Sequence, residues 1–158
     1  MDLKNRKKTL RGFTLIELLV VVAIIGLLTS IISVAINTSR TKSRDARRVT
    51  DMKQIKTGLD LYFSNAAGYP DTAAWVPGVQ LSCNGGSVMR VPQDPTHPVN
   101  IYDYTGGGNS TSGCGTTVRS TFELEFYIEN KGLYYIMDQT GKLRESLTGT
   151  TVGYDQLL

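Results

Sequence analysis

The feature that most constrains this chain is an unbroken apolar run at residues 13–36, in which Glu17 is the only charged side chain. A helix of this length rises about 36 Å, which is enough to cross the hydrocarbon core of a bilayer. A helix that is apolar on every side needs lipid or many apolar neighbours. A secretory signal peptide is the main alternative, but its apolar part is usually shorter, about 7–15 residues. We therefore predict a hydrophobic membrane-spanning helix over residues 13–38.

Positive charge is concentrated just before this run. Residues 1–12 carry five Lys or Arg and one Asp, so the net charge of +3 for the whole chain comes from this short segment. A junction of Gly12 and Phe13 separates it from the apolar run. A charge inside a spanning helix costs about 3 kcal/mol and usually has a partner and a function. The sequence shows no evident partner for Glu17, so this carboxylate is a candidate functional group.

Residues 7–19, KKTLRGFTLIELL, resemble the N-terminal signature of type IV pilins and the related pseudopilins. The resemblance covers residues 1 to about 70. It implies that residues 1–12 are a leader peptide, cut between Gly12 and Phe13 by a membrane prepilin peptidase that also methylates the new amino group of Phe13. It also implies a precursor in the cytoplasmic membrane with its leader inside, and an extracellular or cell-envelope filament of identical copies after assembly. A pilus assembly platform and an ATPase are the further partners it implies, and Glu17 would act in assembly.

Residues 39–158 predict an exported globular domain that begins with an amphipathic helix. Apolar residues recur every three or four positions from Ala46 to Phe63, so the helix should continue to about residue 67. The charged residues between these apolar positions, among them Arg48 and Asp51, are expected on the solvent-exposed faces of the helix. The pairs Arg47–Asp51 and Lys56–Asp60 have the i, i+4 spacing of weak helical ion pairs.

The rest of the domain predicts a small antiparallel β-sheet. Residues 71–116 are rich in Gly, Pro, Ser, Thr and Asn, and predict a connecting region with short strands and an exposed loop at residues 106–109. Apolar and polar residues alternate over residues 121–129, as in a strand with one buried face. Return strands follow, and the tail at residues 146–158 is expected on the surface. A sheet laid across the long helix gives an α+β fold.

Only two cysteines are present, Cys83 and Cys114. In a small exported domain we predict that they form a disulfide, which stabilises by about 3–4 kcal/mol for a loop of this size. Two Cys and the single His97 exclude a Cys₄ or Cys₂His₂ zinc site. The resemblance to pseudopilins leaves calcium open, and three carboxylates could contribute oxygens, but their spacing matches no calcium loop. These are Asp94, Asp103 and Asp138. We therefore expect no metal, no cofactor and no catalysis.

The function expected from these features is that of a structural subunit of a type IV pilus or pilus-like filament. One alternative is a major pseudopilin of a type II secretion system. Another is a minor or competence pilin with a DNA- or surface-binding role. The basic cluster at residues 40–56 could bind DNA, contact an acidic face of a neighbouring copy, or be solvated. Because it contains no recognised nucleic-acid-binding motif, nucleic acid is not an expected partner.

Overall fold

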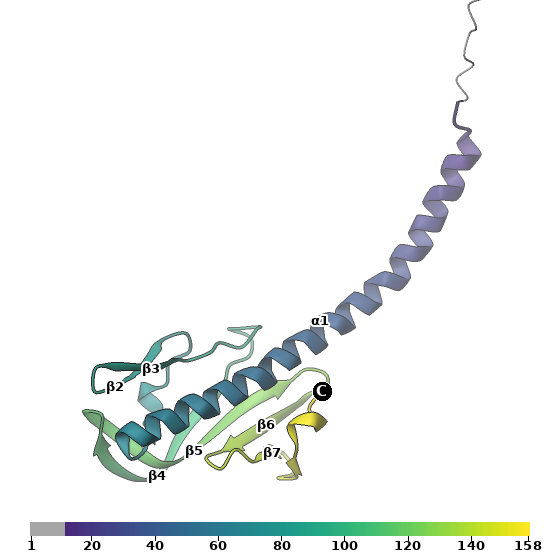
Figure 1. Ribbon diagram of the computed structural model, residues 1–158. Helices are drawn as coiled ribbons and strands as arrows, with labels where there is room; N and C mark the ends of the chain where they lie inside the picture. Colours follow the sequence, from purple (N-terminus) through teal and green to yellow (C-terminus); the bar gives the residue numbers. More distant parts are fainter. Residues whose placement is uncertain (1–11) are drawn as a thin grey trace, which may run out of the picture. The chain divides into compact units, whose positions relative to one another are not determined.

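The computed structural model describes residues 12–158, except for the side chains of residues 31–35. The predicted leader therefore lies outside the described residues, apart from Gly12. The chain divides into two compact units, Met1–Ser39 and Arg40–Leu158. One helix, α1 (Leu15–Ala66), contributes to both units (Figure 1). Its bounds agree with the continuous helix predicted from the sequence.

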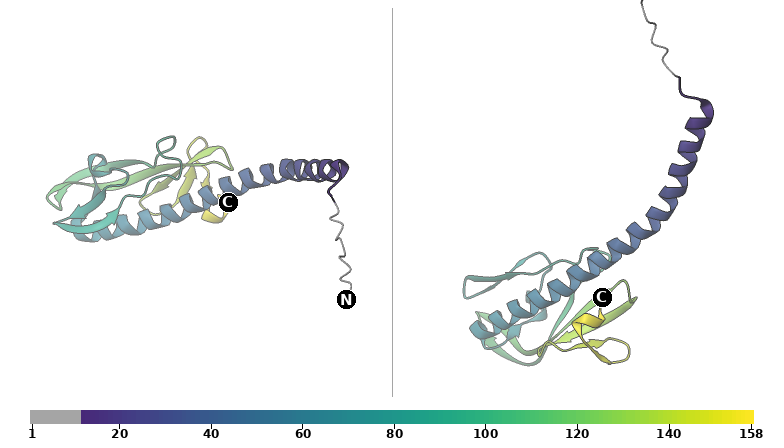
Figure 2. Two further views of the ribbon diagram at one scale, coloured as in Figure 1. Left: turned by 90° about the horizontal axis from the view of Figure 1, so that it is seen from above. Right: turned by 45° about the vertical axis from the view of Figure 1, so that its right-hand side comes forward.

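The second unit contains a six-stranded antiparallel sheet beside the C-terminal part of α1 (Figures 1 and 2). The strand β5 pairs with β1, β4 and β6, and the order continues from β6 through β7 to β8. Two further strands, β2 and β3, form a separate hairpin. The α+β prediction is therefore confirmed. The strands are β1 (Tyr69–Pro70), β2 (Gln80–Cys83), β3 (Gly86–Arg90), β4 (Asp103–Gly113), β5 (Thr116–Ile128), β6 (Leu133–Asp138), β7 (Leu143–Glu145) and β8 (Thr151–Val152).

Alternation along β5 determines which face of the sheet meets the helix. Its even-numbered apolar side chains are fully buried, as the sequence predicts, and its odd-numbered acidic residues lie on the other face. Helix α1 supplies the opposing layer of the core through residues spaced by three or four positions. The buried residues of this layer pair are Phe122, Leu124, Phe126 and Ile128 of β5, and Val49, Met52, Ile55, Leu59 and Tyr62 of α1.

The prediction of a loop at residues 106–109 is wrong, because β4 runs through these residues, although Gly108 and Asn109 are exposed as predicted. Tertiary packing explains the run of glycines better than loop flexibility does. A Cβ on Gly106 would lie 2.8 Å from the carbonyl oxygen of Pro70, so only glycine allows this close approach. Gly108 has a φ of 71° and lies where the register with β5 shifts. The glycines therefore allow β4 to bulge and still pair.

The predicted surface position of the C-terminal tail is also wrong in part. Strand β8 pairs with β7, and a short 3₁₀ helix at Tyr154–Gln156 follows. Leu157 is fully buried in the apolar core. The ammonium of Lys53, on α1, lies 5.2 Å from the centre of the Tyr154 ring. The tail thus closes the core against the helix because Leu157 supplies an apolar side chain there.

Candidate functional site

The N-terminal end of α1 is closed by a reciprocal capping box between Thr14 and Glu17. The backbone N–H of Thr14 donates to Glu17 Oε2 at 2.9 Å and the Thr14 hydroxyl donates to the same oxygen at 2.8 Å. In return, the backbone N–H of Glu17 donates to Thr14 Oγ1 at 3.3 Å. Each side chain thus satisfies a backbone donor that the helix leaves unpaired at its start. Thr14 is therefore a partner of Glu17 in its own chain that was not evident from the sequence.

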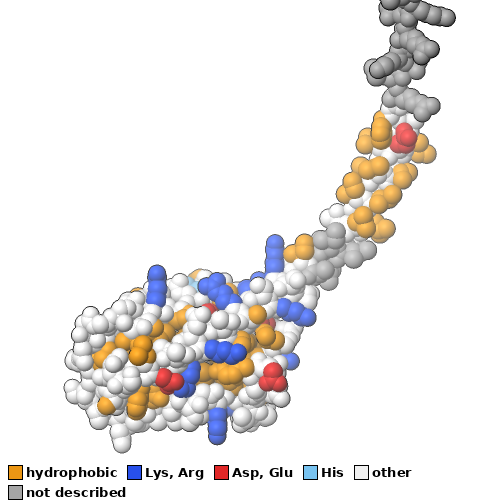
Figure 3. All heavy atoms as spheres, viewed as in Figure 1, with side chains coloured by type: hydrophobic (Ala, Val, Ile, Leu, Met, Phe, Trp, Pro, Cys, Tyr) orange, Lys and Arg blue, Asp and Glu red, His pale blue; other side chains and the backbone are white. Residues whose placement is uncertain are grey.

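The apolar side chains after this cap are exposed. Between Phe13 and Leu28, the exposed fraction of the large apolar residues ranges from 45% at Val21 to 82% at Leu15. Figure 3 shows hydrophobic side chains along the described part of the first unit, Met1–Ser39. A contiguous apolar surface of this extent marks a site of contact with a membrane or with other protein. Gly12 and Phe13, the residues of the predicted cleavage site, are exposed as well.

Within the described residues, no helix combines enough length with enough apolar character to pass through a bilayer. The predicted membrane-spanning helix, residues 13–38, includes residues 31–35, whose side chains are not among those the structure describes.

In the second unit, α1 is fastened to two loops by a buried cluster around Arg48. The Arg48 side chain is fully buried, and so are its partners Asp45 and Asp94. Its Nε and Nη2 donate to the two oxygens of Asp94 at 2.6 and 3.0 Å. Its Nη1 donates to Asp45 at 2.8 Å and to Glu129 at 2.7 Å. The prediction that Arg48 is solvated is therefore wrong.

The carboxylates of the Arg48 cluster have further donors, so none of its charges is left alone. Asp45 accepts the backbone N–H groups of Glu129 and Asn130 at 2.9 and 2.8 Å. Glu129 also accepts from Arg44. Asp94 accepts from the backbone and the hydroxyl of Thr96, at 2.8 and 2.7 Å. The cluster thus joins α1 to the turn after β5 and to the loop before β4.

The pKa shifts in the Arg48 cluster favour the charged forms. Burial opposes the charge on Asp94, but hydrogen bonds from Arg48 and Thr96 outweigh it and lower the pKa of this carboxyl. Hydrogen bonds from Arg44 lower the pKa of Glu129 more than burial raises it. Burial also disfavours the Arg48 cation, yet its bonds to Asp94 and Glu129 raise the pKa of the guanidinium. These groups are thus structural ion pairs that remain ionised at neutral pH.

A second buried acid, Asp51, is held by Tyr102. The Tyr102 hydroxyl donates to Asp51 Oδ2 at 2.8 Å, and Arg47 Nε lies 3.9 Å from the same oxygen. Burial raises the pKa of Asp51 more than these two contacts lower it. The prediction that Asp51 is solvated is therefore wrong, whereas the predicted pair with Arg47 is present. The predicted pair Lys56–Asp60 is present too.

The predicted disulfide between Cys83 and Cys114 is present in the structure, with the two Cα atoms 4.8 Å apart. It joins the end of β2 to the turn between β4 and β5, two segments separated by 31 positions. This crosslink ties the β2–β3 hairpin to the main sheet. Both cysteines of the chain are used in it.

The structure does not gather the carboxylates considered for calcium. Asp94 belongs to the Arg48 cluster, and Asp103 lies on the outer face of β4. Asp138 accepts hydrogen bonds from Thr140 and from the backbone N–H of Lys142. Across the described residues, no group of three or more His, Cys, Asp or Glu side chains is arranged to hold a metal ion.

Comparisons with known proteins point to one family. A model described as the prokaryotic N-terminal methylation motif matches residues 7–33. The type II secretion system core protein G of Vibrio cholerae is 32% identical over 115 residues, which cover 67% of this chain and 76% of that protein. The core protein G of Escherichia coli is 32% identical over 95 residues, 54% of this chain and 66% of that protein.

A shorter match reaches a pilus protein. The type IV major pilin protein PilA of Myxococcus xanthus is 40% identical over 63 residues, which cover 40% of this chain and 29% of that protein. No solved structure shows significant similarity to the chain. The methylation motif at residues 7–33 agrees with the capped, exposed apolar part of α1. The similarity to core protein G extends far beyond this motif, into the α+β unit. The chain belongs to the type IV pilin and pseudopilin family.

Proposed function

We propose that this chain is a pseudopilin, the structural subunit of a pilus-like filament in a type II secretion system. The observation that carries the proposal is its similarity to type II secretion system core protein G over 67% of the chain. This similarity is much longer than the methylation motif at residues 7–33. It favours the secretion filament over the type IV pilus, which was the first expectation from the sequence.

The exposed apolar side chains of α1 support two successive apolar environments for the subunit, one before and one after its assembly into the filament. Before assembly, the lipid of the cytoplasmic membrane covers these side chains, and after assembly the same surface packs against neighbouring copies. The basic leader would remain in the cytoplasm until a prepilin peptidase cuts between Gly12 and Phe13 and methylates Phe13. An assembly platform and an ATPase would then add the subunit to the filament. The proposal requires no metal, cofactor or catalytic group in the chain itself.

Replacement of Gly12 by Val tests the processing step. Gly12 is exposed, and a Cβ added there meets no other atom within 4 Å, so this change does not disturb the described packing. We expect the variant to reach the membrane but to keep its leader. Gly26→Val is the matched control, because a Cβ on Gly26 also meets nothing within 4 Å. Normal cleavage of the Gly12 variant between residues 12 and 13 would contradict the proposed processing.

The type IV pilus is the second candidate, because the Myxococcus xanthus major pilin is 40% identical over 63 residues. Deletion of the gene separates the two functions. A pseudopilin deletion stops the export of folded proteins across the outer membrane and leaves surface pili unchanged. Loss of surface pili with unchanged export would favour the type IV pilus and contradict the secretion filament.

A further inference from the structure

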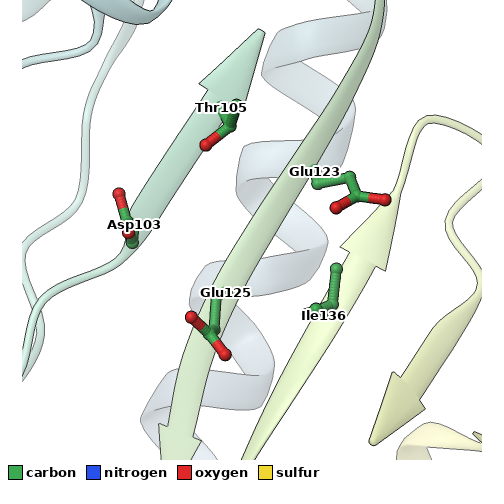
Figure 4. A pocket seen from close by; sticks show the side chains of 5 residues that line it. All are labelled: Asp103, Thr105, Glu123, Glu125 and Ile136. Carbon is green, nitrogen blue, oxygen red and sulfur yellow. The ribbon is translucent and has the colours of Figure 1, made fainter. Parts of the chain in front are cut away.

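The outer face of the sheet, which faces away from α1, carries an acidic surface whose charge is only partly compensated. Asp103 on β4 lies directly opposite Glu125 on β5, and Glu123 lies two residues before Glu125 on the same face (Figure 4). Like charges directly opposite each other in a sheet are destabilising. With Thr105 and Ile136, these three residues line a pocket of about 90 Å³. We call these five residues the acidic sheet surface.

The neighbours of the acidic sheet surface neutralise only part of its charge. Arg144 pairs with Glu123 at 2.6 Å. Ser146 donates a neutral hydrogen bond to Glu125 at 2.7 Å. Among the described residues, Asp103 has no hydrogen bond or ion pair to its side chain. The three carboxylates and the one guanidinium thus leave two negative charges on an open sheet face.

A groove of the opposite charge lies beside α1. It has a volume of about 330 Å³ and is bounded by α1 on one side and by the β2–β3 hairpin region on the other. Arg47 and Arg90 supply its positive charge, and Asp51, which lies 3.9 Å from Arg47, compensates one of the two cations, so that one positive charge remains in the groove. The Arg47 side chain is 65% exposed. Arg90 donates through Nε to the carbonyl oxygen of Gly78 at 2.8 Å. We call this the basic groove.

The two surfaces do not overlap, because α1 covers the inner face of the sheet and the acidic sheet surface is on the outer face. One copy can therefore use both at once. Two different, complementary surfaces on one subunit make a head-to-tail contact, and such a contact forms an open helical filament when its rotation does not close a ring. Complementary charge also steers association and fixes the register of the contact.

We propose that the acidic sheet surface of one copy docks against the basic groove of the next copy. The occupant is a second copy of this chain, because the two surfaces are complementary in charge and occur together on every copy. The inference rests on the proposed function as a filament subunit. It adds the contact between the globular units to the contact made by the apolar helices.

Charge exchange in the full-length chain tests the inference, with the yield of sheared filaments as the readout. Asp103→Arg and Arg90→Asp each place like charges across the proposed contact, so each should lower the yield about tenfold. The double variant exchanges the charges and should restore the yield to within about twofold of the wild type. Asp155→Arg and Lys131→Asp make the same changes of charge at exposed positions outside both surfaces and should leave the yield unchanged.

The amount and leader cleavage of each variant in the membrane fraction show whether it folds and is processed. If a reversal variant is degraded, Asp103→Asn and Arg90→Gln replace it, and their combined effect should be smaller than the product of the single effects. Unchanged yield in the single variants, or no recovery in the double variant, would overturn the inference while the wild-type filaments still support the proposed function. Absence of filaments from the wild type would instead overturn the proposed function.

Discussion

Replacement of Arg48 by Met tests whether the buried ion cluster holds the globular unit together. The variant keeps an apolar stem in the buried space but removes the guanidinium. Asp45 and Asp94 are also buried, and both would lose their buried counter-charge. Thr96 and two backbone N–H groups would remain as their neutral donors. We expect a large loss of stability because unpaired charges would stay inside the protein.

The size of the loss follows from the burial of the cluster. Removing one partner of a buried ion pair typically costs about 3–5 kcal/mol. For a unit of this size, 1 kcal/mol corresponds to roughly 4 °C, so the melting temperature should fall by about 12–20 °C. The double variant Arg48→Met/Asp94→Asn should lose at least about 1 kcal/mol less than the sum of the single losses, because it also removes one orphaned charge.

Thermal unfolding followed by circular dichroism measures this effect, with the disulfide kept intact. Arg47→Met is the matched control, because this neighbouring arginine is 65% exposed and lies 3.9 Å from its partner. The Arg47 guanidinium is mostly in solvent and its contact with the buried Asp51 is long, and Asp51 keeps its hydrogen bond from Tyr102. This control should therefore lose at most about 1 kcal/mol and melt close to the wild type. Equal melting temperatures for the two variants would refute the claim that the Arg48 cluster is structurally important.

Three further predictions concern the crosslink, the N-terminal cap and pH. Reduction of the Cys83–Cys114 bond should destabilise the globular unit by about 3–4 kcal/mol, and two readily alkylated thiols in native exported protein would contradict the pairing. Glu17→Gln retains the capping-box hydrogen bonds and removes the charge. We expect both this variant and Glu17→Val to be cleaved normally and to assemble poorly. A normal filament yield would show that the charge has no role in assembly. Folding lowers the pKa values of Asp94 and Glu129, so their ionised forms stabilise the folded globular unit. This stabilisation is present above about pH 4 and should be lost as acid protonates the two carboxylates. A melting temperature that stays unchanged down to about pH 2 would contradict this.

Elements with a strong local pattern could be predicted from the sequence. Helix α1 and strands β5 and β6 follow from apolar spacing, because one face of each element is buried against the other. The glycines of β4 could not be assigned in this way. Glycine is required at position 106 because Pro70, which is distant in sequence, approaches it closely. The local composition does not reveal this contact, and it suggested a loop instead.

Two features of the site, the burial of Arg48 and the partner of Glu17, have local signals in the sequence, although neither was predicted. Arg48 is four positions before Met52 on the buried stripe of α1, so its spacing places it on the face that meets the sheet. Thr14 and Glu17 have the spacing of a capping box, which gives Glu17 a partner in its own helix. The partners of Arg48 across the fold, Asp94 and Glu129, have no local signal because they come from distant loops.

The intact mass of the subunit released by shearing the filaments shows whether the chain is a processed filament subunit. We expect the released protein to begin at Phe13, to carry one additional methyl group and to retain one disulfide. Absence of the chain from the sheared material, or a mature protein that begins beyond Ala23, would contradict its assignment as a processed filament subunit.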